Sequence, residues 1–382
     1  MEALELIDVI SMGETSTVQF KRTIDHDNQL AAELCAFANS FGGSILFGVE
    51  DDGNISGLPS GEVKKLNSRI ANIASNNIRE PIFPISEVIK VDNKNVLVVT
   101  INESQSKPHF DQSGAIWVKN LSDKRRVTSK EELRRIFQDT HIFYADEQVV
   151  SRSTSADLDI DAFFSFYNKT YEENLEKSDE IKDRLLENLN IIQKGSLSLA
   201  GLLFFSKNPQ RFRPEFSTKA VAYFGTDPSG TKYRDSEDLT GTLPQQLAKA
   251  KAFLSRNLNH IQGDHSFNSE GDLEIPMAAL EELLVNMLVH RNYFISAPQK
   301  LFIFDDRVEM HSPGCLTNTL TVEQIKLGNS IPRNPIIHGF ASKILPYRGI
   351  GTGIRRAIRL YPSIDLKNDI SENRFRVIIS RK

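Results

Sequence analysis

The segment from Leu280 to Tyr293 constrains the fold of this chain most, because its helical periodicity is unbroken. Glu282, Asn286 and His290 are each four residues apart, so they line one face of the predicted helix. A carboxylate that takes a proton from water, one turn before an amide oxygen that binds Mg²⁺, suits nucleotide chemistry. A solvated polar stripe on an ordinary helix is the alternative interpretation. The apolar face, at spacings i, i+3, i+4, i+7 and i+8, consists of Leu280, Leu283, Leu284, Met287 and Leu288.

The length of 382 residues predicts two or three domains, since single hydrophobic cores stop growing near ~250 residues. The hydrophobic share of 40% and the charged share of 25% are typical of a soluble globular protein. No apolar run is long enough to span a membrane, and residues 1–8 lack the basic region of a signal peptide. Cys35 and Cys315 are far apart on apolar backgrounds, which predicts buried thiols and a cytoplasmic location.

Short strands and helices alternate over the first 145 residues. An apolar run at 44–49, directly after Gly42 and Gly43, predicts a buried strand. Thr128 begins a capping box, which opens a helix at 129–139. The pattern predicts an α/β unit whose other elements are strands at 16–22, 84–91, 95–102 and 115–119 and helices at 28–40 and 61–78.

Three motifs follow one another in this unit, at Glu14–Lys21, Ala36–Gly43 and Phe47–Gly53. In this order they resemble the Schlafen AlbA_2 domain, also called the divergent AAA-4 domain, over residues 8–140. The resemblance implies a nucleic-acid-directed protein. Nucleases of that family carry two glutamates around the first strand and an aspartate after the second. Glu14 and Asp51 match two of these catalytic, metal-binding positions, whereas the second glutamate falls on Gln19.

The amide at Gln19 matters because converging carboxylates hold the Mg²⁺ or Mn²⁺ that activates water. Replacing one carboxylate with an amide removes a charge and weakens the metal site. Glu14 then has two interpretations, as a metal ligand or as a structural surface acid. We therefore expect nucleic-acid binding ahead of nuclease activity.

Basic side chains outnumber acidic ones over residues 119–135 and predict a nucleic-acid-binding patch. Trp117 and Phe110 flank it and could stack on bases. A solvated helix face with i,i+4 ion pairs is the alternative interpretation. The net charge of −4 argues against a protein that coats nucleic acid, but it allows a local patch. The basic residues of the segment are Lys119, Lys124, Arg125, Arg126, Lys130, Arg134 and Arg135, and Lys21 and Arg22 join them if the first strand lies nearby.

Residues 146–265 form a mostly helical connecting region with no catalytic pattern. A polar linker at 141–155 precedes it. The expected elements are helices at 157–171, 178–190, 196–205 and 242–258, with a strand at 219–223.

Two further features follow the opening helix in the C-terminal region. Strands at 300–304 and 307–311 are joined by Asp305 and Asp306 and lead to Gly314. A glycine-rich run then opens a helix that bears Arg355, Arg356 and Arg359. Glycines at a helix start let backbone N–H groups approach phosphates. The three glycines of the run are Gly349, Gly351 and Gly353.

This order resembles the C-terminal ATP-binding domain often found behind Schlafen AlbA_2, a divergent relative of the GHKL (Bergerat-fold) ATPases. The resemblance implies ATP and Mg²⁺ as cofactors, with Glu282 as general base and Asn286 as Mg²⁺ ligand. Asp305 or Asp306 matches the acid that receives the adenine amino group. Gly314 matches the adenine loop, although it comes late for the family's Asp-x-Gly-x-Gly pattern. Gly349, Gly351 and Gly353 match the phosphate loop.

Together these patterns predict an α/β protein, an α+β arrangement of three parts. Residues 1–145 form a Schlafen AlbA_2-like domain, 146–265 the helical middle and 266–382 a Bergerat-like α/β sandwich. We expect a cytoplasmic, ATP-responsive protein that binds DNA or RNA, either a transcriptional regulator or a defence factor. Weak ATP hydrolysis and a homodimer or higher oligomer are compatible with it. The alternatives are a metal-dependent ribonuclease acting on tRNA or single strands, and a non-catalytic scaffold with degenerate sites.

Overall fold

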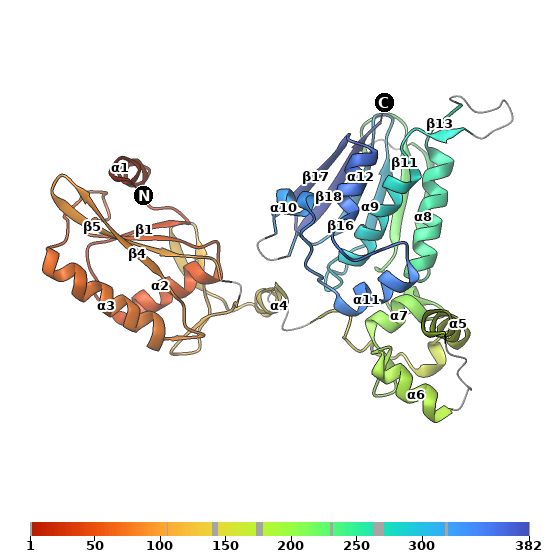
Figure 1. The fold of residues 1–382 in the computed structure, drawn as a ribbon, viewed down its shortest axis with the longest axis horizontal. Helices are drawn as coiled ribbons and strands as arrows, with labels where there is room; N and C mark the ends of the chain where they lie inside the picture. The colour runs from red at the N-terminus through yellow and green to blue at the C-terminus, as the bar shows by residue number, and fades with distance from the viewer. Residues whose placement is uncertain are drawn as a thin grey trace. The chain divides into compact units, whose positions relative to one another are not determined.

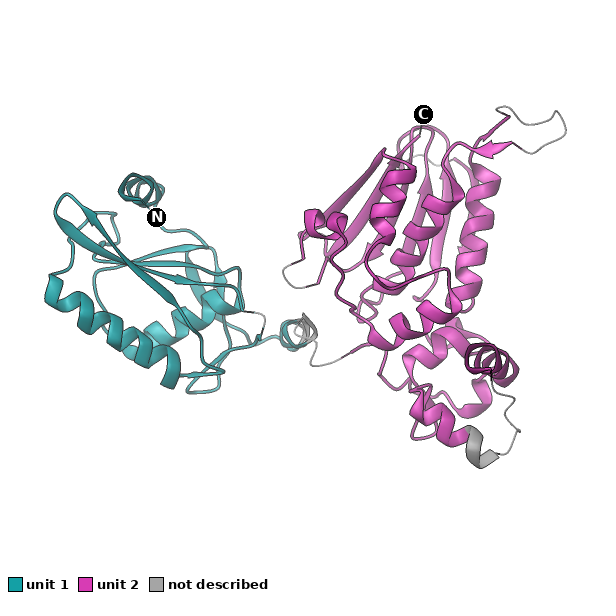
Figure 2. Cartoon of the chain, in the orientation of Figure 1, with its two compact units in different colours: residues 1–142 teal, residues 143–382 magenta. Residues whose placement is uncertain are grey.

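The computed structural model describes residues 2–104, 106–139, 144–172, 179–229, 232–262, 271–317 and 320–381. The chain divides into two compact units, Met1–Ile142 and Phe143–Lys382 (Figure 2). Both mix helices with sheets, which confirms the predicted α/β class. Part of the predicted linker at 141–155 and the side chains of Arg134 and Arg135 lie outside the described residues.

A four-stranded sheet forms the centre of the first unit, in the order β1-β2-β5-β4. Only β1 and β2 are parallel, and the other neighbours are antiparallel. The apolar run predicted as a buried strand is β2, whose last three residues are buried. The strands are β1 (Val18–Lys21), β2 (Gly43–Phe47), β4 (Ile85–Val91) and β5 (Lys94–Ile101).

Helices cover both faces of this sheet (Figure 1). Leu34 and Phe37 of α2 (Asp27–Asn39) pack with α3 (Ser60–Asn76) on one face. Leu6 of α1 (Ala3–Ser11) packs on the other. A hairpin of β7 and β8 lies against α2. The remaining elements are β3 (Ile78–Arg79), β6 (Phe110–Asp111), β7 (Trp117–Asn120), β8 (Asp123–Arg126) and α4 (Lys130–Asp139).

The second unit is built on a six-stranded sheet in the order β12-β11-β15-β16-β18-β17. All neighbours are antiparallel except β11 and β15. Val308 and Met310 of β16 are buried in the core, and Arg307 and Glu309 alternate with them on the opposite face of the sheet, as a period of two requires. The strands are β11 (Thr218–Tyr223), β12 (Tyr233–Leu239), β15 (Gln299–Ile303), β16 (Arg307–Pro313), β17 (Ile364–Asp369) and β18 (Arg374–Ser380).

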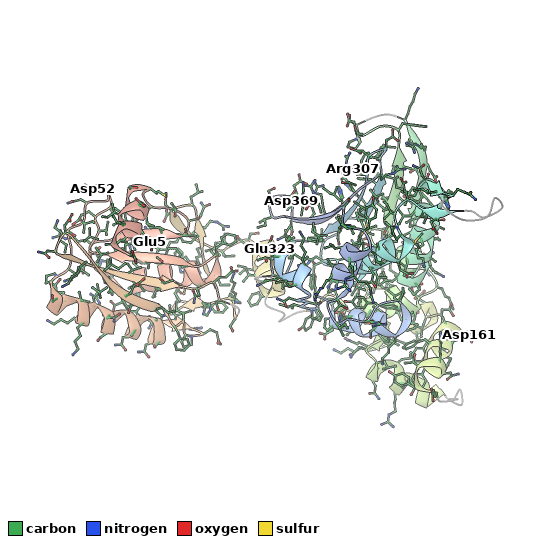
Figure 3. The ribbon with its side chains drawn as sticks, turned by 45° about the horizontal axis from the view of Figure 1, so that its top comes forward. Glu5, Asp52, Asp161, Arg307, Glu323 and Asp369 are labelled. Carbon is green, nitrogen blue, oxygen red and sulfur yellow. The ribbon has the colours of Figure 1, made fainter. Side chains whose placement is uncertain are left out.

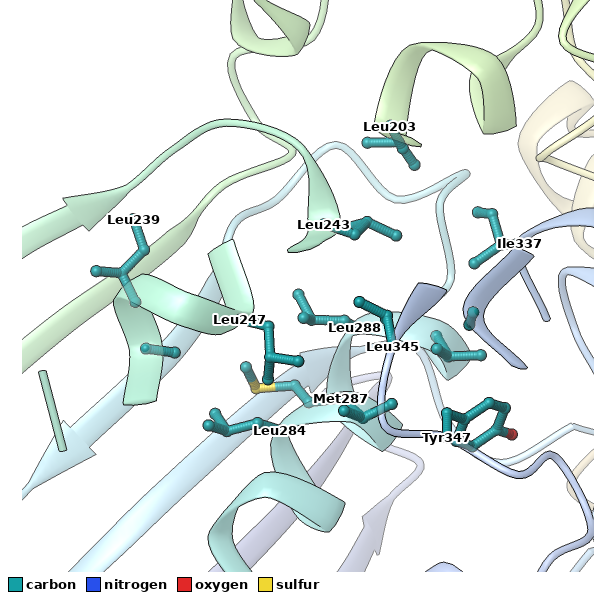
Figure 4. Packing of buried hydrophobic residues seen from close by; sticks show 14 of the residues in the cluster. Leu203, Leu239, Leu243, Leu247, Leu284, Met287, Leu288, Ile337, Leu345 and Tyr347 are labelled. Atoms are coloured by element: carbon teal, nitrogen blue, oxygen red, sulfur yellow. The ribbon is translucent and has the colours of Figure 1, made fainter. Parts of the chain in front are cut away.

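The helices α8, α9 and α12 lie side by side over one face of this sheet (Figure 1). The central one, α9, is buried over most of its surface because it packs against the sheet and both neighbouring helices. Leu284, Met287 and Leu288 of α9 meet Leu247 of α8 in the core (Figure 4). These helices are α8 (Leu243–Asn257), α9 (Met277–His290) and α12 (Gly353–Leu360).

The predicted middle region supplies strands β11 and β12 to the same sheet and packs into the same core as the C-terminal segment. The helix predicted at 196–205 begins only at Leu199, because the Ser198 hydroxyl caps it by accepting the Gly201 N–H at 2.9 Å. The other elements are η1 (Ser155–Asp157), α5 (Ile160–Tyr171), α6 (Asp179–Asn188), β9 (Ile192–Gln193), β10 (Ser196–Leu197), α7 (Leu199–Phe205), η2 (Pro209–Arg211), β13 (His260–Ile261), β14 (Asp272–Leu273), α10 (Val322–Leu327) and α11 (Pro335–Ile344).

Among the helices of the described ranges, none combines the length and the apolar composition that crossing a membrane requires. Cys35 is buried, as expected, whereas Cys315 is partly exposed at the end of β16. The two do not form a disulfide.

Candidate functional sites

The polar stripe of α9 faces a cavity rather than open solvent. Glu282, Asn286 and His290 all line it, which joins the three residues that the helical spacing put on one face. Glu282 is only 9% exposed, so its charge needs a partner. Arg356 of α12 provides one through an ion pair. The Asn286 side chain turns back along its own helix, where Nδ2 donates to the Glu282 carbonyl oxygen at 2.6 Å.

Segments distant in sequence close the rest of the cavity. They are the end of β16 with the loop after it, the loop after α10, and the chain from Tyr347 into α12. The predicted loop residues Gly314, Gly349, Gly351 and Gly353 all lie in this lining. Many of the other lining side chains are apolar, and they include Met287, Met310, Leu316, Ile325, Phe375 and Val377.

The glycines of the last loop are required by close approach. A Cβ on Gly353 would lie 2.5 Å from Glu282 Oε2 and 3.2 Å from Asn286 Nδ2, so a side chain there would displace the ends of these two side chains. Gly351 has φ +76°, and a Cβ there would overlap the Gly328 carbonyl oxygen. Glycine at 351 therefore lets the loop approach the Gly328 backbone, and glycine at 353 lets the start of α12 lie against Glu282 and Asn286 as they stand.

Asp305 and Asp306 do not reach this cavity. They occupy the turn that precedes β16, whereas the cavity lies at the opposite end of that strand. Asp305 pairs with Arg234 and accepts the Gly225 N–H at 2.8 Å. Asp306 pairs with Arg307, which is labelled in Figure 3. Both carboxylates thus have cationic partners at the end of β16 that is far from the cavity.

A histidine–tyrosine pair lies at the side of the cavity. His290 Nε2 and the Tyr347 hydroxyl are 2.9 Å apart. Burial, with His338 and Arg333 nearby, lowers the pKa of His290 to about 4, so this imidazole is neutral at pH 7. Burial, with Glu282 nearby, raises the pKa of Tyr347 to about 12. Tyr347 and Arg333 stand in irregular loops, so no periodic signal could have identified them.

The chemistry of the lining suits a phosphate-bearing ligand with a hard cation. The N–H groups at the start of α12 and the Arg356 guanidinium favour anions. Asn286 and Glu282 offer oxygen donors of the kind that Mg²⁺ takes when phosphates supply its remaining ligands. Over the described ranges, no three His, Cys, Asp or Glu side chains gather to hold a metal on their own. The residues present therefore fit a metal–nucleotide complex better than a bare ion.

In the first unit, Glu14 accepts hydrogen bonds from two residues of the following strand, β1. Its Oε1 accepts the Phe20 N–H at 2.7 Å and the Gln19 amide at 2.8 Å. Asp51 is exposed in the turn after β2. Gln19 also accepts from Lys119 Nζ through Oε1, at 2.8 Å. An amide both donates and accepts, so it can bridge a carboxylate and an ammonium where a glutamate could not.

Lys119 is an internal cation of this unit. Its side chain is 2% exposed, and Nζ donates to Glu33 Oε1 at 2.9 Å and to the Ser122 carbonyl oxygen at 2.8 Å. The other oxygen of Glu33 accepts from Lys124 Nζ at 2.8 Å. The ammonium of Lys119 also lies 4.6 Å from the centre of the Phe37 ring. Lys119 and Lys124 therefore hold the β7–β8 hairpin to α2.

The remaining predicted contact residues lie closer to solvent. Arg22 is 75% exposed and 3.5 Å from Glu50, and Lys21 is partly buried. Arg126 is exposed. Arg125, 46% exposed, pairs with Glu132. Trp117, the first residue of β7, donates its indole N–H to Asp111 at 2.8 Å, and this bond fixes the orientation of its ring.

Comparison with known proteins gives two family matches. Residues 14–128 match the model described as "Schlafen, AlbA_2". Residues 297–379 match HATPase_c_4, described as "Putative ATP-dependent DNA helicase recG C-terminal". Glu282 and Asn286 lie just before that match. No curated protein matches the chain.

Two solved structures are similar to the chain. The DIP2311 protein from Corynebacterium diphtheriae shares 18% identity over 96% of this chain, with a TM-score of 0.47, and the chain spans 65% of that protein's length. The N-terminal domain of the "Putative ATP-dependent DNA Helicase RecG-related Protein" from Nitrosomonas europaea shares 26% identity. That alignment covers 34% of this chain and 96% of the domain, with a TM-score of 0.26.

Each family match lies within one compact unit and confirms the resemblance drawn from the motifs of that part of the chain. The chain therefore carries a region of the Schlafen AlbA_2 family in its first unit and a region of the recG C-terminal HATPase_c_4 family in its second.

Proposed function

We propose that this is a nucleic-acid-binding protein whose binding responds to ATP, held with Mg²⁺ in the cavity of the second unit. The observation that carries the proposal is the convergence of Glu282, Asn286 and the Gly349–Gly353 loop on one cavity. These residues come from two segments far apart in sequence, and their chemistry suits a nucleotide. The name of the matched C-terminal family, which refers to ATP, supports the same assignment.

In this proposal some residues would bind the phosphates and others the metal ion. The glycine loop and the start of α12 would surround the phosphates, and Arg356 would neutralise part of their charge. Asn286 would bind the Mg²⁺ ion, which offsets the negative charge of the phosphates. Glu282 is the candidate general base. Its ion pair with Arg356 lowers its reactivity until phosphates draw the guanidinium away, so we expect slow hydrolysis at most.

The nucleic-acid surface would lie on the first unit. Among the predicted contact residues, Arg22, Arg125 and Arg126 reach solvent, and Lys21 is partly buried. Lys119 and Lys124 would act indirectly, by holding the hairpin that carries Arg125 and Arg126. The bonds that Glu14 makes to Phe20 and Gln19 favour a structural role for that acid, and hence binding ahead of metal-dependent cleavage.

A transcriptional regulator and a defence factor are both compatible with this arrangement, as are a cytoplasmic location and ATP-dependent association of subunits. The proposal requires only that ATP changes how nucleic acid binds. Such a coupling is typically ~1–3 kcal/mol, or about 5–150-fold, and must be reciprocal between the two ligands.

Calorimetry with Mg²⁺ and ATP on the full chain tests the site. Asn286→Ala should abolish ATP binding while leaving the fold intact. The matched control is Asn72→Ala, the same change at an exposed position of α3 in the other unit, which should bind ATP normally. Unchanged affinity in Asn286→Ala would refute the assignment. Glu282→Gln should retain ATP and lose any hydrolysis.

A further inference from the structure

We infer that the cavity selects nucleotides by their phosphates and does not distinguish adenine from guanine. The ligand class is then purine nucleoside triphosphates in general, with ATP and GTP bound about equally. This inference rests on the proposed function and specifies the ligand of the same site.

The first support is the distribution of acids. Glu282 is the one carboxylate among the described residues that line the cavity, and it pairs with Arg356 beside the glycine loop. An adenine amino group is a donor, so a site that selects adenine needs an acceptor in a fixed place. Glu282 pairs with Arg356 next to the glycine loop, so it is not placed to accept a hydrogen bond from the base.

The second support is the location of the two aspartates that matched the adenine-binding acid. Asp305 and Asp306 precede β16, and Gly314 follows it. The seven residues of β16 separate them, so Asp306 lies roughly 26 Å from Gly314 along the strand, at about 3.3 Å per residue. Ion pairs with Arg234 and Arg307 hold both carboxylates at that far end. Neither can reach a base in the cavity.

The third support is what stands near Gly314 instead. Ser312 lines the cavity two residues before it and is 8% exposed. Its hydroxyl donates to the Met287 carbonyl oxygen at 3.5 Å, a bond long enough to be exchanged for one to a ligand. A hydroxyl can donate or accept, so it does not separate an adenine amino group from a guanine carbonyl. Arg333 Nη2 donates to the Cys315 carbonyl oxygen at 2.6 Å beside the same loop. A guanidinium has only donors and suits a guanine oxygen at least as well as adenine.

Much of the remaining lining is apolar, and its other polar side chains include Thr317 and Asn329, whose hydroxyl and amide groups both donate and accept hydrogen bonds. Neither kind of surface separates the two purines strongly. A site built to hydrogen-bond one group rejects an analogue lacking it by roughly 10⁴–10⁵-fold, whereas an apolar pocket rejects an isostere by only about 10²-fold. The phosphate contacts are identical for every nucleoside triphosphate. The two purines should therefore bind with similar affinity.

Calorimetry of the full chain with Mg²⁺ and ATP, and separately with Mg²⁺ and GTP, tests the inference. We expect dissociation constants within about 10-fold of each other, or ~1.4 kcal/mol. A preference for ATP greater than that overturns the inference and leaves the proposed function standing. If neither nucleotide binds, the proposed function falls, and this inference falls with it.

A matched pair of variants locates the base. Ser312→Asp supplies the missing acceptor, so it should raise the ratio of ATP to GTP affinity at least about 10-fold, a gain of ~1.4 kcal/mol in discrimination. Ser330→Asp is the control, because Ser330 also lines the cavity but lies beside Gly351 of the glycine loop. The new carboxylate should repel phosphate and therefore weaken the binding of ATP and of GTP by the same factor. An unchanged ratio in a folded Ser312→Asp protein would contradict the placement of the base beside β16. The comparison of ATP with GTP on the unmodified chain needs no variant and decides the inference even if Ser312→Asp fails to fold.

Discussion

The charged groups around Lys119 in the first unit and around Glu282 in the second have different surroundings. In the first, the buried ions bind one another: Glu33 is held by Lys119 and Lys124, and Gln19 links Lys119 to Glu14. In the second, Glu282 and Asn286 line a cavity, and glycine at 353 lets the start of α12 lie against them. A charge network that is complete within the protein supports shape, whereas one that lines an open cavity can take a ligand. The difference supports a structural role for the ions around Lys119 and the binding role proposed for Glu282 and Asn286.

The largest expected effect concerns the internal cation. Lys119→Met should destabilise the first unit by about 3 kcal/mol, the lower end of the range for breaking a buried ion pair, because Lys124 still compensates Glu33. Denaturant unfolding measures the loss. Lys124→Met is the control, and since its side chain is 23% exposed it should cost less. If the Lys119→Met protein were as stable as the unmodified chain, the buried ions of the first unit would not have the structural role inferred for them.

The next effect is the acid sensitivity of the second unit. His290 has a pKa of about 4 when folded and ~6.5 when unfolded, so the unfolded chain binds more protons between these values. Stability is therefore full at neutral pH and falls by at most ~3 kcal/mol as the pH drops from about 6.5 to about 4. Unfolding measured across this range should show the slope in the native chain and a shallower one in His290→Gln. The same slope in both would exclude His290 as its source.

Charge reversal on the hairpin should have a smaller effect. Replacing Arg125 and Arg126 by glutamate should weaken nucleic-acid binding for all sequences alike, because phosphate contacts release counterions whatever the bases are. The slope of log affinity against log salt should flatten by roughly one unit per lost contact. Lys90→Glu, at an exposed position on β4, serves as the control. Unchanged affinity and slope in the double variant would make the patch a solvated face.

The smallest effect is expected at the far end of β16. Asp306→Asn should leave nucleotide affinity unchanged, because that carboxylate pairs with Arg307 outside the cavity. A calorimetric loss of more than about 1 kcal/mol, which exceeds the usual effect of a surface change, would mean that the aspartate acts on the ligand.

Local periodicity predicted much of the first unit, but in the second it missed β12, β17 and β18, half of the six-stranded sheet. The helical repeat at Leu280–Leu288 predicted α9, and glycines before an apolar run predicted β2. The motifs also identified Glu282, Asn286 and the glycine loop, which the structure brings to one cavity. Periodicity does not say which end of a strand meets a site, so it could not show that Asp305 and Asp306 lie at the end of β16 away from the cavity.

Long-range charge pairs were beyond local patterns. Lys119 is 86 residues from Glu33 in sequence, and Arg356 is 74 residues from Glu282. A lysine that sits in a buried ion pair and one that is free to contact phosphate look the same in a charge run. Only the packing of β7 against α2 separates them, and it assigns Lys119 to the interior.

The most direct test of the central claim is a titration of nucleic acid into the full chain with and without a non-hydrolysable ATP analogue and Mg²⁺. We predict that the analogue changes nucleic-acid affinity by about 5-fold or more, and that nucleic acid changes affinity for the analogue by the same factor. Asn286→Ala should abolish the shift. Identical nucleic-acid affinities with and without a bound analogue would contradict the claim, because the two units would then bind their ligands independently.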